Sequence, residues 1–345
     1  ALFFARRGGV AMLRADMRAL SLRFAVFLTL VAVVPAATAE RFTFAALGCM
    51  PYGEVNYPAF ERLIAEINRH GPAFTVHLGD TKGGSERPSE AFLQRVKAWF
   101  NTFDGPLIYT PGDNEWTDVH RESNGRQDPL FWLGLVRATY FAEERSLGRR
   151  PLPLVTQRRD PPFRKFVENA RWTMGGVVFA TVHVVGSNNN HSPELPGALD
   201  EFAQRDAANE AWVRAAFAEA RETGAPGIAF FCQAQPFAQD YGQPGRSPGF
   251  KRFLDTLEQE ARAFGKPVLL VHADEHRYRL EPAKAFERDG EPVPNVTQLE
   301  TFGAGDIHGV LVTVDPGSPQ VFLAGPLLVP GNPLPVLPRP RPVAP

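Results

Sequence analysis

The sequence contains little cysteine and almost no net charge. Only two cysteines occur among 345 residues, which excludes a disulfide-rich scaffold and a zinc site built mainly from cysteine. The 37 Lys and Arg residues are balanced by 38 Asp and Glu residues, so neither a nucleic-acid-binding surface nor a charged tail is indicated. The partner or substrate must therefore be inferred from local motifs.

Long hydrophobic runs, internal repeats and several common catalytic signatures are also absent. The apolar run at 24–34 is shorter than the about 20 residues that a membrane helix needs, so no stable membrane span is expected. No Ser-His-Asp order, phosphate-binding loop or dinucleotide fingerprint is visible. With 44% hydrophobic residues, the chain can nevertheless bury a large core.

The two ends of the chain differ in composition from the middle. A basic stretch at 17–23, the apolar run and Ala37-Thr38-Ala39 follow one another in the order of a secretory signal. We expect residues 1–39 to be a signal peptide with upstream residues and the protein to be periplasmic or secreted, with an uncleaved anchor helix as the alternative. Residues 329–345 are rich in proline, which predicts a disordered tail and leaves 40–328 as one domain.

Apolar runs and helical periodicity alternate within that domain. Strands are expected at 42–47, 74–78, 107–110, 177–185, 228–231, 268–271, 310–314 and 321–323. Helices are expected at 57–69, 89–100, 129–143, 198–222 and 249–264. This order predicts an α/β fold, in which ligands bind beyond the carboxyl ends of the strands.

Acidic residues follow three of the expected strands. Asp80 and Asp113 each come after a glycine, which lets the backbone turn sharply at the end of a strand. Each aspartate alone is also typical of a turn or a helix cap, but two from neighbouring strands indicate a metal site. Asp274 and His276 follow a third strand, where the alternative is a solvated loop.

The order and spacing of these motifs resemble the calcineurin-like metallophosphoesterase superfamily, in particular its bacterial secreted members, over about residues 42–325. The resemblance implies a layered sandwich of two mixed β-sheets flanked by helices. It also implies roles for individual residues: metal ligands at Asp80, Asp113, Asp274 and His276, and a catalytic Asn114 where the family has a His beside the scissile phosphate.

The sequence departs from the family pattern at several motifs, with Asp113 in place of an Asn and Asp274 in place of a His, and it lacks two of the expected motifs. Cys49-Met50-Pro51 stands where the family has Asp-x-His, and Gln233 or Gln235 is the nearest substitute for an isolated His. The remaining oxygen-rich set suits Mg, Mn or Ca better than Zn or Fe, and it fits one metal site better than two.

The implied activity is hydrolysis of a small phosphoester by a metal-activated water. The alternative is a catalytically impaired relative that binds a phosphate-bearing or other anionic ligand, because the Asp-x-His motif and the catalytic His are missing. A hydrolase with Cys49 as nucleophile is a third interpretation, but no His or Asn partner stands at a recognisable spacing.

Other polar residues near these motifs have two interpretations each. Lys82 would pair with Asp80 or hold a phosphate oxygen in a catalytic role, or it would face solvent. His183 lies in a long apolar strand, which is typical of a core histidine, and His272 either lines the site or ends its strand. Tyr52 would stack on a substrate ring or pack in the core.

The two cysteines are expected to lie near each other. Cys49 and Cys232 both end strands that the resemblance places at the active-site edge. If their Cα atoms lie within about 7 Å they could form a disulfide, and either thiol could instead be packed or contact a metal. The sequence leaves these alternatives open, and it does not indicate an oligomeric state.

Overall fold

The structure is a computed structural model that describes residues 40–237, 247–282 and 293–335. The expected signal segment, residues 1–39, lies outside these ranges. No helix in the described ranges combines the length and the apolar character that a membrane span requires.

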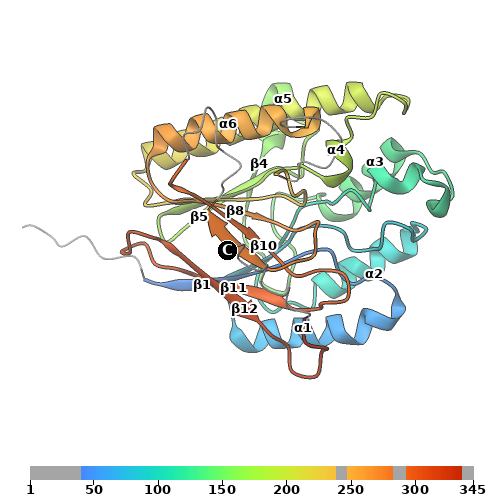
Figure 1. The fold of residues 1–345 in the computed structure, drawn as a ribbon, viewed down its shortest axis with the longest axis horizontal. Helices are drawn as coiled ribbons and strands as arrows, with labels where there is room; N and C mark the ends of the chain where they lie inside the picture. Colours follow the sequence, from blue (N-terminus) through green and yellow to red (C-terminus); the bar gives the residue numbers. More distant parts are fainter. Residues whose placement is uncertain (1–39, 238–246, 283–292, 336–345) are drawn as a thin grey trace, which may run out of the picture. The chain divides into compact units, whose positions relative to one another are not determined.

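Two mixed β-sheets form the centre of the described domain (Figure 1). The five-stranded sheet has the order β12 (Phe322–Leu327), β11 (Gly309–Val314), β1 (Phe42–Leu47), β2 (Phe74–His77) and β3 (Leu107–Tyr109). The seven-stranded sheet has the order β4 (Val155–Thr156), β5 (Ala170–Met174), β6 (Val177–Thr181), β7 (Ile228–Phe231), β8 (Val268–His272), β10 (Val296–Glu300) and β9 (Arg279–Pro282). The predicted pair of mixed sheets is thus confirmed.

Each sheet contains a block of adjacent parallel strands. Strands β1, β2 and β3 run parallel to one another, and so do β6, β7, β8 and β10. Strands β11 and β12 form the antiparallel side of the five-stranded sheet, and the antiparallel pairings of the seven-stranded sheet lie toward its two edges. Because loops after parallel strands leave a sheet at one edge, each sheet presents a set of loops there.

Helices cover both outer faces of the sandwich (Figure 1). The α-helices are α1 (Tyr57–His70), α2 (Glu90–Phe100), α3 (Pro129–Tyr140), the single turn α4 (Gly186–Asn189), α5 (Ala198–Glu222) and α6 (Pro248–Phe264). Short 3-10 helices are η1 (Glu54–Asn56), η2 (Thr117–His120), η3 (Glu122–Asn124), η4 (Gln157–Arg159) and η5 (Pro161–Phe163). In Figure 1, α5 and α6 lie over the seven-stranded sheet, and α1 and α2 lie beside the five-stranded sheet.

Side chains that alternate in direction along β6 pack against the five-stranded sheet on one face and against helices on the other. Phe179 points to the five-stranded sheet, where its ring centroid lies 5.9 Å from that of Phe44 and 5.0 Å from that of Phe74. Val178 and Ala180 belong instead to the apolar cluster shared with α5 and α6. Burial on both faces explains why β6 reads as a continuous apolar run in the sequence.

Four strands and several element ends differ from the sequence prediction. The sequence did not indicate β4, β5, β9 or β10, which lie toward the edges of the seven-stranded sheet or beside its edge strand. In β5 and β9, charged residues interrupt the apolar pattern, so local periodicity is weak. The strand expected at 177–185 ends at Thr181, although the chain beyond it remains buried.

Part of the expected proline-rich tail is attached to the folded body. Asn332 is buried, and its side-chain amide donates to the carbonyl oxygens of Ala59 and Ile307 at 3.1 and 2.6 Å. The Pro333 carbonyl lies 2.8 Å from Nε2 of His308. Residues 336–345 lie outside the described residues.

Candidate metal centre

Three aspartates from both sheets converge just beyond the carboxyl ends of their strands. Asp80 follows β2, Asp113 follows β3 and Asp274 follows β8. One carboxylate oxygen from each lies within 4.8 Å of the others. Asp80 and Asp113 are almost completely buried, at 2% and 6% exposure, so solvent offers them little stabilisation. These three residues are called the acid cluster below.

At the acid cluster, the backbone adopts conformations that residues other than glycine rarely take. Asp80 and Asp274 have φ angles of 56° and 79°, in the left-handed region. Gly112 approaches Asp80 so closely that a Cβ atom there would collide with the Asp80 carboxylate. Strained backbone of this kind is typical of functional sites, and here it directs carboxylates from separate loops to one point.

Glu115 fixes the two loops of the five-stranded sheet to each other. Its carboxylate accepts hydrogen bonds from the backbone amides of Asp80 at 3.0 Å and Gly112 at 2.9 Å. It also accepts from the backbone amide and, at 2.7 Å, from the hydroxyl of Thr81. Glu115 therefore holds the Asp80 and Asp113 loops in register. The sequence alone does not indicate this role, because the signal lies in backbone amides brought together by folding.

Gln233, which follows β7, places its side-chain amide among the three carboxylates. Its oxygen accepts a hydrogen bond from the backbone amide of Gly186 at 2.6 Å, so its nitrogen must face the acid cluster. That nitrogen lies 3.1 Å from Asp80 Oδ2, 3.2 Å from Asp113 Oδ1 and 3.1 Å from Asp274 Oδ1. An amide carries two hydrogens, so it cannot satisfy three carboxylates at once.

The electrostatics of the acid cluster favour compensation of its negative charge by protons or by a cation. Burial raises the pKa of Asp80 and of Asp113 well above the usual range, and the neighbouring carboxylates raise both pKa values further. Burial also raises the pKa of Asp274. Oxygen atoms that share a cation at roughly 2.0–2.6 Å lie at most about 5 Å apart, which matches the separation in the acid cluster. The residues present thus fit a hard divalent cation.

A second group of polar side chains borders Asp80. The Tyr52 hydroxyl donates to Asp80 Oδ2 at 3.2 Å, and the Cys49 thiol donates to the same oxygen at 3.6 Å. The Tyr52 oxygen also lies 3.3 Å from Nε2 of His276 and accepts from the side-chain amide of Asn114 at 3.3 Å. His276 therefore lies beside the acid cluster, connected to it through Tyr52, rather than within it.

Cys49 and Cys232 are both free and buried. Cys49 accepts a hydrogen bond from the backbone amide of Asp274 at 3.2 Å, so this thiol contacts the acid cluster. Burial and then the charges of Asp80 and Asp274 raise the pKa of Cys49 well above its usual value. Cys232 instead donates to the backbone oxygen of Ala234. Of the alternatives open for the cysteines, the structure contains two packed thiols.

One turn after β6 contributes residues that the sequence patterns do not single out. Residues 187–190 all have positive φ angles, near 49–61°, which asparagine tolerates better than most residues. The turn places the Ser187 hydroxyl 2.8 Å from Asp113 Oδ2 and 2.7 Å from Asp118 Oδ1. Arg121 donates to the Ser187 oxygen at 3.1 Å and pairs with Asp118 at 2.7 Å. A Gly-Ser-Asn run after a buried strand is the signal that could have indicated this contribution.

The other predicted lining residues occupy varied positions. Gln235 donates its backbone amide to Asp274 at 3.3 Å, while its side chain accepts from the backbone of Phe237. Lys82 is buried rather than solvent-facing, and its ammonium donates to Asn124 Oδ1 at 2.8 Å with no ion pair to Asp80. Burial lowers the pKa of this lysine.

His183 and His272 both lie outside the acid cluster. His183 is a core histidine whose Nδ1 lies 2.7 Å from Glu168 Oε1. His272 is the last residue of β8, is fully buried and lies 3.3 Å from the side-chain oxygen of Gln298. Burial lowers the pKa of His272 to about 4, so it is neutral at physiological pH.

Comparison with known proteins identifies the fold. No family model matches the sequence, and no curated protein matches it. Among solved structures, a purple acid phosphatase, PPD1 from yellow lupin (Lupinus luteus) seeds, is 12% identical, with a TM-score of 0.52 over 86% of this chain and 53% of that one. The chain has the calcineurin-like phosphoesterase fold. A structure of PhoD is 13% identical, with a TM-score of 0.49 over 82% of this chain and 65% of that one.

The chain thus spans between half and two thirds of the length of these two structures. In this calcineurin-like fold, the acid cluster lies where the parallel strands of both sheets end.

Proposed function

We propose that this protein hydrolyses a phosphoric ester with the help of a divalent cation held by Asp80, Asp113 and Asp274. The observation that carries the proposal is the convergence of three carboxylates within 4.8 Å, two of them buried. Buried like charges repel, so a cation or bound protons must compensate them. Three oxygen donors from separate loops suit Mn, Mg or Ca.

The residues around the acid cluster supply the other functions that hydrolysis needs. A bound divalent cation would lower the pKa of a water molecule and offset negative charge on the phosphoryl oxygens. Asn114 and Tyr52 carry hydrogen-bond donors at the border of the acid cluster, and we assign them to binding phosphoryl oxygens. Hydrolysis joins a water oxygen to phosphorus and breaks the bond to the organic group, which leaves as an alcohol after gaining a proton.

His276 is suited to accepting a proton from the attacking water, which supplies the proton that the leaving alcohol gains. Burial lowers its pKa, so its imidazole is neutral near pH 7 and has one bare nitrogen. Its Nε2 lies 3.3 Å from the Tyr52 oxygen, which in turn contacts Asp80. The proposal therefore uses His276 for proton transfer at the border of the acid cluster, and it leaves the cation to the three aspartates.

A second candidate function is ligand binding without catalysis. The specific observation in its favour is the Gln233 amide, which donates toward all three carboxylates at 3.1–3.2 Å. With some carboxylates protonated, this amide could satisfy the acid cluster without a cation. In that case the protein would bind a phosphate-bearing or other anionic ligand and release it unchanged.

Cation binding and turnover distinguish these candidates. The protein is stripped with a chelator, and binding of Mn, Mg, Ca and Zn is measured by calorimetry, followed by assays with phosphomonoesters and phosphodiesters. We expect one cation per chain and cation-dependent turnover. At a free concentration one hundred times Kd, the cation should stabilise the protein by about 2.7 kcal/mol.

Asp80→Asn should abolish cation binding, the stabilisation and the turnover together. Asp206→Asn is the matched control, because Asp206 is a buried aspartate on α5 that pairs with Arg252 away from the acid cluster. It should leave all three measurements unchanged. Failure of the wild type to bind any of the four cations would refute the cation site, and cation binding without turnover would favour the second candidate.

A further inference from the structure

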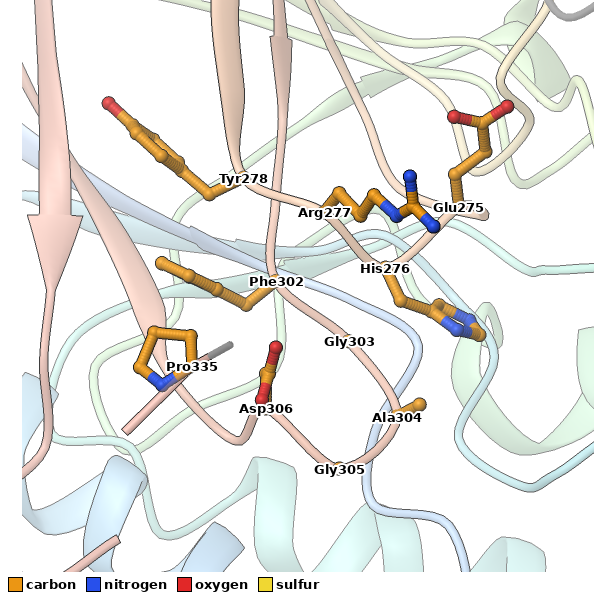
Figure 2. Close-up of a pocket in the computed structure, with 10 residues that line it drawn as sticks. All are labelled: Glu275, His276, Arg277, Tyr278, Phe302, Gly303, Ala304, Gly305, Asp306 and Pro335. Atoms are coloured by element: carbon orange, nitrogen blue, oxygen red, sulfur yellow. The ribbon is translucent and has the colours of Figure 1, made fainter. Parts of the chain in front are cut away.

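A cavity of about 480 Å³ lies at the loops that follow β8 and β10 (Figure 2). Its volume lies within the range of sites for small organic ligands, roughly 300–1,000 Å³. Two loops form it: residues 275–278 between β8 and β9, and residues 302–306 between β10 and β11, with Pro335 at one side. The proposed function uses only one of these residues, His276.

His276 and Tyr52 connect the cavity to the acid cluster. His276 lines the cavity, and its Nε2 lies 3.3 Å from the Tyr52 oxygen, which donates to Asp80 at 3.2 Å. On the other loop, the backbone amide of Ala304 donates to the Cys49 backbone oxygen at 2.7 Å. Asp274 precedes His276 on the same loop by two positions. A ligand with its phosphate at the acid cluster could therefore extend into the cavity past His276.

The far side of the cavity is aromatic. Tyr278 and Phe302 stack with ring centroids 5.3 Å apart and an angle of 17° between the ring planes. Figure 2 shows these two rings and Pro335 on one side of the cavity, with His276 on the other. Packing of Phe302 against His308, with centroids 5.5 Å apart, fixes the inner ring. Flat apolar walls of this kind favour a planar ring over a short alkyl chain.

Charged groups border the aromatic wall without neutralising each other. Within the described residues, neither the Arg277 guanidinium nor the Asp306 carboxylate has an ion pair or a side-chain hydrogen bond, although both line the cavity. Glu275 differs, because it pairs with Arg279. An arginine can stack on a ring or bind its acceptor atoms, and a carboxylate accepts ring N–H groups.

We propose that this cavity binds the organic group of the substrate, and that this group carries a planar ring, as in aryl and nucleoside phosphoesters. The inference rests on the proposed function, since it takes the acid cluster as the place of the phosphate. It assigns Tyr278 and Phe302 to ring recognition and Arg277 and Asp306 to the polar edge of the ring. Short alkyl phosphates would leave the aromatic wall exposed to water.

Binding of phosphonates tests the inference without turnover, because their carbon–phosphorus bond is not an ester. Calorimetry on the whole protein compares phenylphosphonate with methylphosphonate, both with Mn and with chelator. We expect phenylphosphonate to bind about tenfold more tightly. Tyr278→Ala should reduce this preference to less than twofold. Tyr57→Ala, a partly buried tyrosine on α1 that packs on Trp99, is the control and should keep the preference.

Measurements of turnover provide a second test of the cavity assignment. Tyr278→Ala should lower kcat/KM for phenyl phosphate about tenfold and change kcat/KM for glycerol phosphate less than twofold.

Arg277→Gln removes an exposed side chain with little risk to folding, and it should weaken binding of adenosine monophosphate severalfold. Arg164→Gln, at another exposed arginine, is the control and should leave this binding unchanged.

The outcomes separate the two proposals. If phosphoesters are hydrolysed but phenylphosphonate has no advantage, or keeps it in Tyr278→Ala, the cavity assignment is wrong and the proposed function stands. If no phosphoester is hydrolysed but the ring preference exists and depends on Tyr278, the cavity assignment is supported as a ligand site and the proposed function fails.

Discussion

The buried carboxylate of Glu168 and the carboxylates of the acid cluster have opposite electrostatics. Glu168 accepts hydrogen bonds from Arg137 at 2.5 and 3.1 Å, and His183 lies 2.7 Å away. Burial alone would raise the pKa of Glu168, but Arg137 and His183 lower it below the usual range. In the described part of the chain, no cation forms an ion pair with the acid cluster, and its pKa values are raised.

This difference separates a structural role from a functional one. A buried carboxylate that has matched partners holds segments together, whereas one that lacks them marks a place for a ligand or a proton. The two regions are also in contact. Arg205 lies over the Trp116 ring at 5.2 Å, and that ring lies 5.5 Å from the His183 ring. Glu168, Arg137 and His183, called the matched network below, thus support the loop that carries Asp113 and Trp116.

The largest expected effect comes from breaking the matched network. Glu168→Gln removes the charge that compensates Arg137 and permits the close contact with His183, so it should destabilise the protein by about 3–5 kcal/mol. Urea unfolding at pH 7 measures this loss. Glu210→Gln, at a partly exposed pair with Arg214, is the control and should change stability by at most about 1 kcal/mol. Equal effects of the two variants would remove the basis of the comparison.

Glu300 is an intermediate case that sharpens the comparison. It is fully buried, and Arg279 Nε lies 3.3 Å from its Oε2, but without the geometry of a hydrogen bond. Burial raises the pKa of Glu300 to about 8 despite this arginine. Folding therefore favours the protonated acid, and stability should fall as the pH rises from the unfolded pKa of 4.5 to about 8.

Glu300→Gln should remove this pH dependence. Relative to the variant, the wild type should lose about 2–4 kcal/mol between pH 5 and pH 8, since a pKa difference of one corresponds to about 1.4 kcal/mol. Unfolding curves at both pH values check the difference. Glu194→Gln, at an exposed glutamate, should follow the wild type. A parallel pH profile for Glu300→Gln would show that Arg279 compensates the buried charge.

The acid cluster should respond to a neutral substitution in the opposite direction from Glu168. Asp113 has a raised pKa, so in chelator the wild type should lose stability as the pH rises above the unfolded value of 3.8. Asp113→Asn should then be more stable than the wild type at pH 7 in chelator. Thermal unfolding with chelator measures this sign, and added Mn should stabilise only the wild type. Destabilisation of Asp113→Asn in chelator would instead indicate an ordinary turn aspartate.

Much of the fold could be predicted from local sequence because its central strands and helices carry strong patterns. The helix at 198–222 has the predicted bounds, and α1 ends at His70, followed by Gly71 in the left-handed conformation that glycine favours. Strands β4, β5, β9 and β10 escaped prediction because pairing with a neighbour, rather than local periodicity, stabilises them.

The site could be predicted in part. The convergence of Asp80, Asp113 and Asp274 follows from strand order, because each stands at the carboxyl end of a parallel strand. The positions of His276 and Lys82 could not be predicted, because the direction of a loop side chain depends on contacts with distant residues. Tyr52 separates His276 from Asp80, and Asn124 binds the Lys82 ammonium. Ser187 depends on a left-handed turn that no periodicity signals.

The acid cluster joins parts of the chain that are far apart in sequence. Gln233 contacts Asp80 across 153 positions and Asp113 across 120 positions. Contacts of such separation form only after large loops have closed, which slows folding. The acid cluster exists only once the two sheets have docked, because Asp80 and Asp113 follow strands of one sheet and Asp274 follows a strand of the other. Cation capture during refolding would therefore report when the two sheets meet, which the formation of either sheet alone does not report.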